Sequence, residues 1–313
     1  MAKKRWLAAA FYAIIFFIRI HPKGANMDAA ILRALEHIRC PFFDIFFSVF
    51  TALGEELIIA AIIAVIYLCF SKRLGEQALV TVLSASCITT AVKSGVRRLR
   101  PYVAGDVTRV DIDNPFVSTV DLDADMSFPS GHATATSGFF GTVALYLRRA
   151  LPSVLCAVFV LLVMLSRLYF GVHYPTDVLC GLLIGAGCAA LWQLIYTKWR
   201  GARLYIYLGI AVCTLPLLFW ERIGTTSMFE ISAMTLATAI GLLIEDKLIR
   251  FEDTKKWLHR LFRLLITVCI AAIPYLILHF ALPEGNWSSF CTYFATLLAA
   301  MTLAPLTFKK LKI

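Results

Sequence analysis

The sequence is dominated by long apolar runs that are separated by short polar or basic segments. These runs lie at about residues 6–20, 55–70, 75–96, 132–148, 152–170, 176–197, 203–220, 228–245, 262–282 and 288–306. Most hold roughly 16 to 22 residues, the length that a helix needs to cross a hydrocarbon core of about 30 Å. We therefore predict an all-α fold, a polytopic integral membrane helical bundle with about ten transmembrane segments.

The composition excludes a soluble globular chain, because 60% of the 313 residues are hydrophobic and only 16% are charged. The formal net charge is +10, and the basic residues flank apolar runs. Lysine and arginine are enriched in this way in the cytoplasmic loops of membrane proteins. They form no soluble basic face, so no nucleic-acid partner is expected. Most of the nine cysteines lie singly within apolar runs, which predicts small buried residues and neither a disulfide framework nor a zinc site.

The basic segments between the runs predict the orientation of the chain. They lie at residues 71–73, 148–149, 198–203, 245–263 and 309–310. Ten crossings place all of them, together with residues 3–5, on the cytoplasmic side, as the positive-inside rule requires. We expect a multi-pass protein of the plasma membrane (the inner membrane in a bacterium) with both termini cytoplasmic.

Two stretches near the N-terminus are harder to assign. The run at 6–20 is short and has Arg19 at its end, so crossing the membrane and lying along the interface both stay open. Residues 27–52 combine a helical polar pattern with an aromatic-rich part, which favours a helix at the membrane surface over a span. No small-residue cleavage site follows the first run, so no cleavable signal peptide is expected.

Residues 93–101 (KSGVRRLRP) form the first of three motifs at the ends of apolar runs. Lys93, Arg97 and Arg100 are spaced i, i+4 and i+7, so one helix face presents three cations where the chain leaves the membrane. Such charges are costly at this depth unless they face a partner or a water-filled cavity. Simple snorkelling of long basic side chains to the interface is the ordinary alternative.

The second motif, residues 129–132 (PSGH), directly precedes an apolar run. Ser130 is positioned to cap the following helix, and Gly131 allows a close approach to its free N–H groups, which favours an anion at that point. An ordinary Pro-Ser-Gly turn is the alternative.

The third motif, residues 166–177 (SRLYFGVHYPTD), is the most specific. His173 and Asp177 are four positions apart, a spacing at which the carboxylate can accept the Nδ1 proton and leave Nε2 free as a nucleophile. Asp177 would also stabilise the helix dipole, which is the ordinary reason for an acidic residue there. With the predicted topology all three motifs emerge on the non-cytoplasmic side.

Together the motifs resemble the type 2 phosphatidic acid phosphatase family, which is related to the vanadium haloperoxidases. The family pattern is Lys, six residues, Arg-Pro; then Pro-Ser-Gly-His; then Ser-Arg, five residues, His, three residues, Asp. The chain matches it at Lys93, Arg100, Pro101, Pro129, Ser130, Gly131, His132, Ser166, Arg167, His173 and Asp177. The resemblance covers roughly residues 40–200.

The resemblance implies a membrane lipid phosphatase that acts through a phosphohistidine intermediate. In that scheme His173 attacks phosphorus, Asp177 holds its ring and His132 protonates the leaving oxygen. The implied phosphate-binding residues are Lys93, Arg100, Ser130, Gly131 and Arg167. These donors would do the work of metal ions, so no metal or other cofactor is expected.

The membrane setting favours a lipid substrate, whose tails stay in the bilayer while its headgroup enters the site. Undecaprenyl diphosphate, phosphatidate and phosphatidylglycerophosphate are the candidates for a bacterial source. Arg97 and Arg98 lie outside the fixed positions, and we hypothesise that one of them contacts a second phosphate. Lipid phosphotransfer from the same phosphohistidine, lipid transport and a silent lipid-binding scaffold are alternative functions.

The predicted domains are N-terminal membrane or interfacial helices at 1–52, a catalytic core at 53–200 and a four-helix extension at 201–313. For the extension, a homodimer contact, a wall for lipid access and a fused transport function all stay open. Glu230 within it is interpreted as an interfacial residue.

Residues 102–128 form a long connection with six aspartates: Asp106, Asp111, Asp113, Asp121, Asp123 and Asp125. The glycine and the final glutamate of an EF-hand are missing, so we predict no metal site there. A solvated loop and a lid that selects cationic headgroups both stay open.

Overall fold

The computed structural model describes residues 22–110 and 126–313, and within them every regular element is a helix. The elements are α2 (Pro22–Glu36), α3 (Pro41–Leu53), α4 (Glu56–Val65), η1 (Ile66–Phe70), α5 (Lys72–Val96), α6 (Gly131–Leu147), α7 (Ala150–Tyr169), α8 (Pro175–Lys198), α9 (Arg203–Thr214), η2 (Leu215–Phe219), α10 (Thr226–Ile244), η3 (Glu245–Ile249), α11 (Trp257–Ala281) and α12 (Asn286–Leu311). The predicted all-α membrane bundle is confirmed, and every predicted run from residue 55 onward coincides with a helix.

The described helices differ in how well they suit a membrane span. Six are long and apolar enough to cross a membrane, and the bent pair formed by α3 and α4 with η1 would make a seventh. The predicted spans at 132–148 and 203–220 correspond to the shorter α6 and to α9 with η2. The first predicted run, at 6–20, lies outside the described residues, as do the aspartates between 111 and 125.

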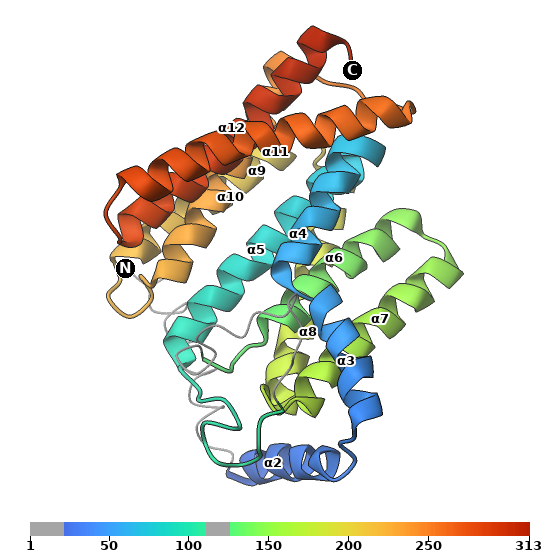
Figure 1. Cartoon of the computed structure of the whole chain (residues 1–313), viewed down its shortest axis with the longest axis vertical. Coiled ribbons are helices and arrows are strands. Elements are labelled where there is room, and N and C mark those ends of the chain that lie inside the picture. Colours follow the sequence, from blue (N-terminus) through green and yellow to red (C-terminus); the bar gives the residue numbers. More distant parts are fainter. Residues whose placement is uncertain (1–21, 111–125) are drawn as a thin grey trace.

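The N-terminal helices only partly match the predicted surface helix at 27–52. Helix α2 lies across one end of the bundle, as a surface helix would (Figure 1). The aromatic-rich α3 instead packs against α7 and meets α4 at an angle of 52°. The predicted surface helix at 27–52 and the predicted span at 55–70 are separated at Gly54 and Glu55, which lie at this bend. The separation therefore falls inside the bundle and not at its surface.

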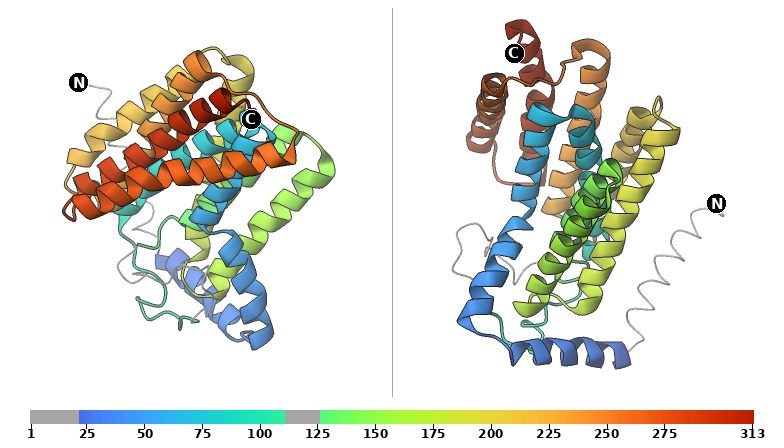
Figure 2. Two further views of the ribbon diagram at one scale, coloured as in Figure 1. Left: turned by 45° about the horizontal axis from the view of Figure 1, so that its top comes forward. Right: turned by 90° about the vertical axis from the view of Figure 1, so that its right-hand side faces the viewer.

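Helix α5 is the central element of the bundle. Helices α6 and α8 pack against one side of it, and the C-terminal helices pack against it through α10 (Figures 1 and 2). At the end with the basic segments, two ion pairs join the predicted core to the C-terminal extension: Arg203 binds Glu76 at 2.8 Å, and Lys72 binds Glu245. Within the extension, Arg203 also binds Asp246 at 3.0 Å. The extension is therefore tied to the core through ion pairs in which the glutamates are buried and the cations are partly exposed.

Close packing of α6 against α8 brings the second and third motifs together. A Cβ atom on Gly185 would lie 2.1 Å from Oγ of Ser137 and 2.3 Å from the carbonyl oxygen of Thr134, so the two backbones touch at this glycine. The same contact aligns the N-terminal ends of the helices, where the Ser130 N–H donates to the Asp177 carbonyl oxygen at 3.1 Å.

Candidate active site

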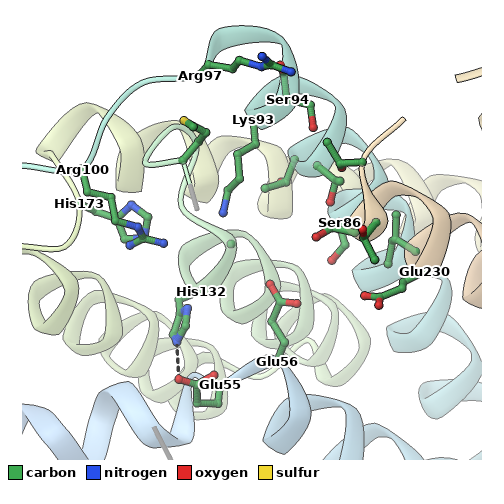
Figure 3. Close-up of a pocket in the computed structure, with 18 of the residues that line it drawn as sticks. Glu55, Glu56, Ser86, Lys93, Ser94, Arg97, Arg100, His132, His173 and Glu230 are labelled. Atoms are coloured by element: carbon green, nitrogen blue, oxygen red, sulfur yellow. Dashed lines mark hydrogen bonds and ion pairs between the residues drawn. The ribbon is translucent and has the colours of Figure 1, made fainter. Parts of the chain in front are cut away.

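All three motifs meet at one cavity of about 880 Å³ (Figure 3). Of the residues predicted from sequence, those that line it are Lys93, Arg97, Arg100, Gly131, His132, Arg167 and His173. Ser130 and Asp177 lie behind this lining with fully buried side chains, and Arg98 is outside it. The sequence therefore predicted most of the polar groups at one end of the cavity.

His173 lies in the short connection between α7 and α8 and is buried. Its Nδ1 atom is 2.8 Å from the carbonyl oxygen of Ser127 and 3.7 Å from Oδ2 of Asp177. Because a carbonyl oxygen only accepts hydrogen bonds, Nδ1 carries the proton and Nε2 keeps its lone pair. The closest partner of Nδ1 is thus the Ser127 carbonyl, whereas the sequence spacing had pointed to Asp177.

Asp177 acts on this arrangement through its neighbours. Its Oδ2 atom accepts hydrogen bonds from the hydroxyl of Ser127 and, at 2.8 Å, from the backbone N–H of Tyr174. Tyr174 follows His173 in the sequence, and Ser127 provides the carbonyl oxygen that accepts from Nδ1 of His173. The Asp177 carboxylate therefore holds both the segment that carries the imidazole and the segment that carries its hydrogen-bond acceptor.

Arg98 fastens the surface helix α2 to this network. Its guanidinium donates to Asp177 at 2.9 Å and to Asp28 of α2 at 3.0 Å, and it lies 3.7 Å above the ring of Tyr174. A side chain with these partners does not face the cavity, so the second-phosphate hypothesis remains for Arg97 alone. Sequence reasoning missed Asp28, because no local pattern links it to residues that are 70 or more positions away.

The cations cluster around the imidazole. Arg100 and Arg167 are both buried; Arg100 lies 3.5 Å from Nε2 of His173 and donates to the carbonyl oxygen of Val172, and Arg167 donates to Thr51 at 2.7 Å. Burial and the charges of Arg100, Arg167 and Lys93 lower the pKa of His173 well below its ordinary value. The imidazole is therefore neutral at physiological pH.

The N-terminal end of α6 forms the next part of the site. The Ser130 hydroxyl caps the helix by accepting from the Ala133 N–H at 3.4 Å, as the sequence predicted, and its side chain is buried. At Gly131 a Cβ atom would lie 2.7 Å from Oε1 of Glu56, so a side chain there would displace this carboxylate. Glu56 thus occupies the side of the helix end at which an anion was expected.

Two glutamates at the α3–α4 bend belong to the site and were not predicted from sequence. Oε1 of Glu55 lies 3.1 Å from Nε2 of His132, and Glu56 points into the cavity (Figure 3). Two adjacent acidic residues within a predicted span were the available signal. The direction in which the Glu55 and Glu56 side chains point depends on the bend between α3 and α4, and a run of apolar residues in the sequence does not reveal that bend.

The C-terminal extension also contributes to the cavity. Thr225, Thr226, Ser227 and Glu230 line it from the start of α10, opposite α5. The interpretation of Glu230 as an interfacial residue stays a prediction, and the structure adds that this residue lines the same cavity as the three motifs. Within the described residues, no group of three or more His, Cys, Asp or Glu side chains is arranged to hold a metal ion.

Known protein families match both the predicted catalytic core and the C-terminal extension of this chain. Residues 76–201 match the PAP2 superfamily, and residues 229–313 match the transmembrane extension of PAP2 superfamily phosphatases. A decaprenylphosphoryl-5-phosphoribose phosphatase of Mycobacterium tuberculosis is 38% identical over 108 residues, which are 34% of this chain and 52% of the relative. A lipid A 4′-phosphatase of Bacteroides thetaiotaomicron is 28% identical over 180 residues, 56% of this chain and 79% of the relative.

Among solved structures, a transmembrane PAP2-type phosphatidylglycerolphosphate phosphatase from Bacillus subtilis aligns with a TM-score of 0.49 and 24% identity. The alignment covers 63% of this chain and 98% of that structure. The chain spans only about half the length of the Mycobacterium relative. With matches to both the superfamily domain and its transmembrane extension, this integral membrane protein belongs to the PAP2 superfamily.

Proposed function

We propose that this protein is a metal-independent lipid phosphatase that cleaves its substrate through a phosphohistidine on His173. One observation carries the proposal: the imidazole of His173, held at Nδ1 by the Ser127 carbonyl, lies with its other nitrogen beside the buried Arg100 in a cavity. This combination provides a nucleophile and a preformed binding site for phosphoryl oxygens.

In the first step, Nε2 of His173 attacks phosphorus and the bond between phosphorus and the lipid oxygen breaks. His132 donates a proton to that leaving oxygen, so the lipid departs as a neutral alcohol. Glu55, at 3.1 Å from Nε2 of His132, stabilises the protonated ring. Arg100, Arg167 and Lys93 balance the charge on the three phosphoryl oxygens.

In the second step, water attacks the phosphohistidine and gives up a proton to His132. The bond between phosphorus and Nε2 breaks, inorganic phosphate is released, and both histidines return to their starting states. Three cationic side chains supply the positive charge for both steps, which is why the proposal includes no metal ion.

The topology supports a position for this chemistry at the non-cytoplasmic face. The site lies where α5 and α7 end and α8 begins, whereas the basic segments at 71–73, 148–149 and 198–203 lie at the opposite ends of these helices. The positive-inside rule places those segments in the cytoplasm. A headgroup at this level can enter the cavity while its tails stay in the bilayer. The named relatives act on lipid-linked phosphates, which supports the same substrate class.

The test is phosphate release by the purified protein in detergent with EDTA. The substrates are undecaprenyl diphosphate, phosphatidate and phosphatidylglycerophosphate, and the variants are His173→Ala and, as control, the exposed His37→Ala. We expect release that persists in EDTA, disappears in His173→Ala and is retained in His37→Ala. Loss of release in EDTA would refute metal independence, and full activity of His173→Ala would refute the nucleophile.

A further inference from the structure

The cavity of about 880 Å³ has room for more than a phosphoryl group. Its volume lies in the upper part of the range of roughly 300–1,000 Å³ that is typical of sites for small organic ligands. Arg100 and His173 occupy one end of the cavity, and Glu230 of α10 lies on the side away from them (Figure 3). Along α10 the cavity therefore accommodates a part of the substrate other than its phosphate.

One contact defines the register of α10 against α5. The two helices run antiparallel, and Sγ of Cys87 lies 3.2 Å from Oγ1 of Thr235. At 1.5 Å per residue, Glu230 lies about 8 Å from Thr235 toward the start of α10, which is close to the level of Lys93. The Glu230 carboxylate is therefore at the depth of the phosphate-binding cations and not deeper in the membrane.

Beyond that level the part of the lining that α10 contributes becomes apolar. Thr226 and Ser227 line the cavity at the start of the helix, Glu230 follows one turn later, and Ile231 and Met234 line the deeper part. This order matches that of a lipid in a bilayer, whose phosphate lies at the interface and whose hydrocarbon lies deeper. Met234 is partly buried and packs against a buried apolar cluster, so its position is defined.

The opposite wall, on α5, is compatible with an apolar occupant. It contributes Ser86 and Thr90, whose hydroxyls lie within a helix. Such hydroxyls can donate to the carbonyl oxygen four residues earlier, as Thr235 does to Ile231 at 2.6 Å. A hydroxyl bonded to its own helix leaves no unsatisfied donor beside a hydrocarbon chain, so this wall does not exclude one.

The cavity meets the lipid between α4 and α10. Among the described helices, α4 packs against α3, α5 and α6, and α10 packs against α5, α9 and α12, but α4 and α10 are not packed against each other. Both nevertheless line the cavity, α4 through Glu56 and α10 through Glu230. The exposed residues of α4 that follow Glu56 are all apolar: Leu57, Ala60, Ala61 and Ala64. Only at the far end of this segment does α11 pack against η1 (Figure 1).

We propose that a hydrocarbon tail of the substrate leaves the site between α4 and α10 and lies against Ile231 and Met234. This inference rests on the proposed lipid phosphatase function and deepens it. The C-terminal extension then has a defined part in the site, because α10 provides one side of the lipid entrance. Met234 is a specificity-determining residue that contacts the tail and not the phosphate.

The first experiment compares dioleoyl phosphatidate with glycerol 3-phosphate, which has the same phosphate ester and no tail. The measured quantity is the ratio of their kcat/KM values in wild type, Met234→Gln, Met234→Leu and Leu303→Gln. Glutamine has nearly the length of methionine but a polar end, whereas leucine keeps the position apolar. Leu303 is an exposed residue of α12 and provides the control for a new polar group in the same extension.

We expect the ratio of phosphatidate to glycerol 3-phosphate to fall about tenfold in Met234→Gln, because roughly two methylene groups of the tail lose an apolar contact worth about a factor of four each. The ratio stays within about twofold of wild type in Met234→Leu and Leu303→Gln. A Met234→Gln variant that still hydrolyses phosphatidate at an unchanged ratio overturns the inference while the phosphatase function stands. An equal fall of the ratio in Leu303→Gln overturns it as well, because the effect is then not specific to position 234.

Photolabelling tests the same contact without turnover. His173→Ala is irradiated with a phosphatidate that carries a diazirine in its acyl chain, and the labelled peptides are identified by mass spectrometry. We expect label on α10 near Met234 that excess unlabelled phosphatidate removes and excess phosphatidylcholine does not. Label on α10 that phosphatidate fails to remove overturns the assigned tail position. If wild type releases no phosphate from any lipid while this label is still displaced, the phosphatase function fails and the tail contact stands.

Discussion

Removal of the Arg98 side chain tests whether buried charge pairing assembles the site. In Arg98→Ala, the carboxylates of Asp177 and Asp28 lose a guanidinium at 2.9 and 3.0 Å, and their side chains are 0% and 5% exposed. Breaking a buried ion pair by removing one partner costs about 3–5 kcal/mol. Arg98 itself is 20% exposed, which favours the lower end of that range.

A loss of about 3 kcal/mol lowers the melting temperature of a chain of 313 residues by roughly 5 °C. The assay is thermal unfolding in detergent, together with kcat on the best lipid of the panel. Arg33→Ala is the matched control, because it removes an arginine that is 61% exposed and 3.9 Å from Asp106. Exposed pairs of this kind contribute at most about 1 kcal/mol.

We expect kcat to fall together with stability, because Asp177 holds the Ser127 segment whose carbonyl orients His173. Conversely, Arg98→Lys retains a positive charge but cannot bridge both carboxylates, so it should recover only part of the loss. A melting temperature for Arg98→Ala that matches that of Arg33→Ala would refute the view that the ion pairs of Arg98 with Asp177 and Asp28 stabilise the site.

Three further predictions concern packing, proton transfer and pH. Gly185→Ala should destabilise the protein by about 1–3 kcal/mol in thermal unfolding, because the new Cβ meets the α6 backbone. Gly187→Ala is the control, because a Cβ there meets nothing within 4 Å, and it should not destabilise the protein. Equal effects of the two substitutions would contradict this account of the packing. Glu55→Gln should lower kcat about tenfold with a smaller change in KM, since it removes the partner of His132 and not a phosphate ligand; a change in KM alone would argue against this role. The pKa of His173 is lowered, so protonation of this residue should reduce kcat/KM only at pH values well below 6.5. Arg100→Ala removes a nearby positive charge and should move this acidic limb of the pH profile to higher pH. An acidic limb that stays in place would exclude His173 as its source.

Much of this protein could be predicted from local sequence. The length and apolar character of the runs determined the helices, because a segment in lipid has to satisfy its own backbone hydrogen bonds. The motifs around Lys93, Ser130 and His173 identified one end of the cavity for a similar reason, since charged and nucleophilic groups are rarely placed at a membrane border without a function. The predicted domain boundaries stay a prediction.

Contacts between distant segments were decided only by the tertiary structure. The partner of His173 Nδ1 is the carbonyl oxygen of Ser127, a backbone group that every residue has and that no sequence pattern marks. Arg98, just beyond the end of α5, binds Asp28 of α2 and Asp177 of α8. Glu55 reaches His132 only because α3 and α4 meet at 52°. Glu230 faces the cavity because α10 packs on α5. Periodicity reports which residues share a face of one helix, whereas the direction of that face depends on how the helices pack together.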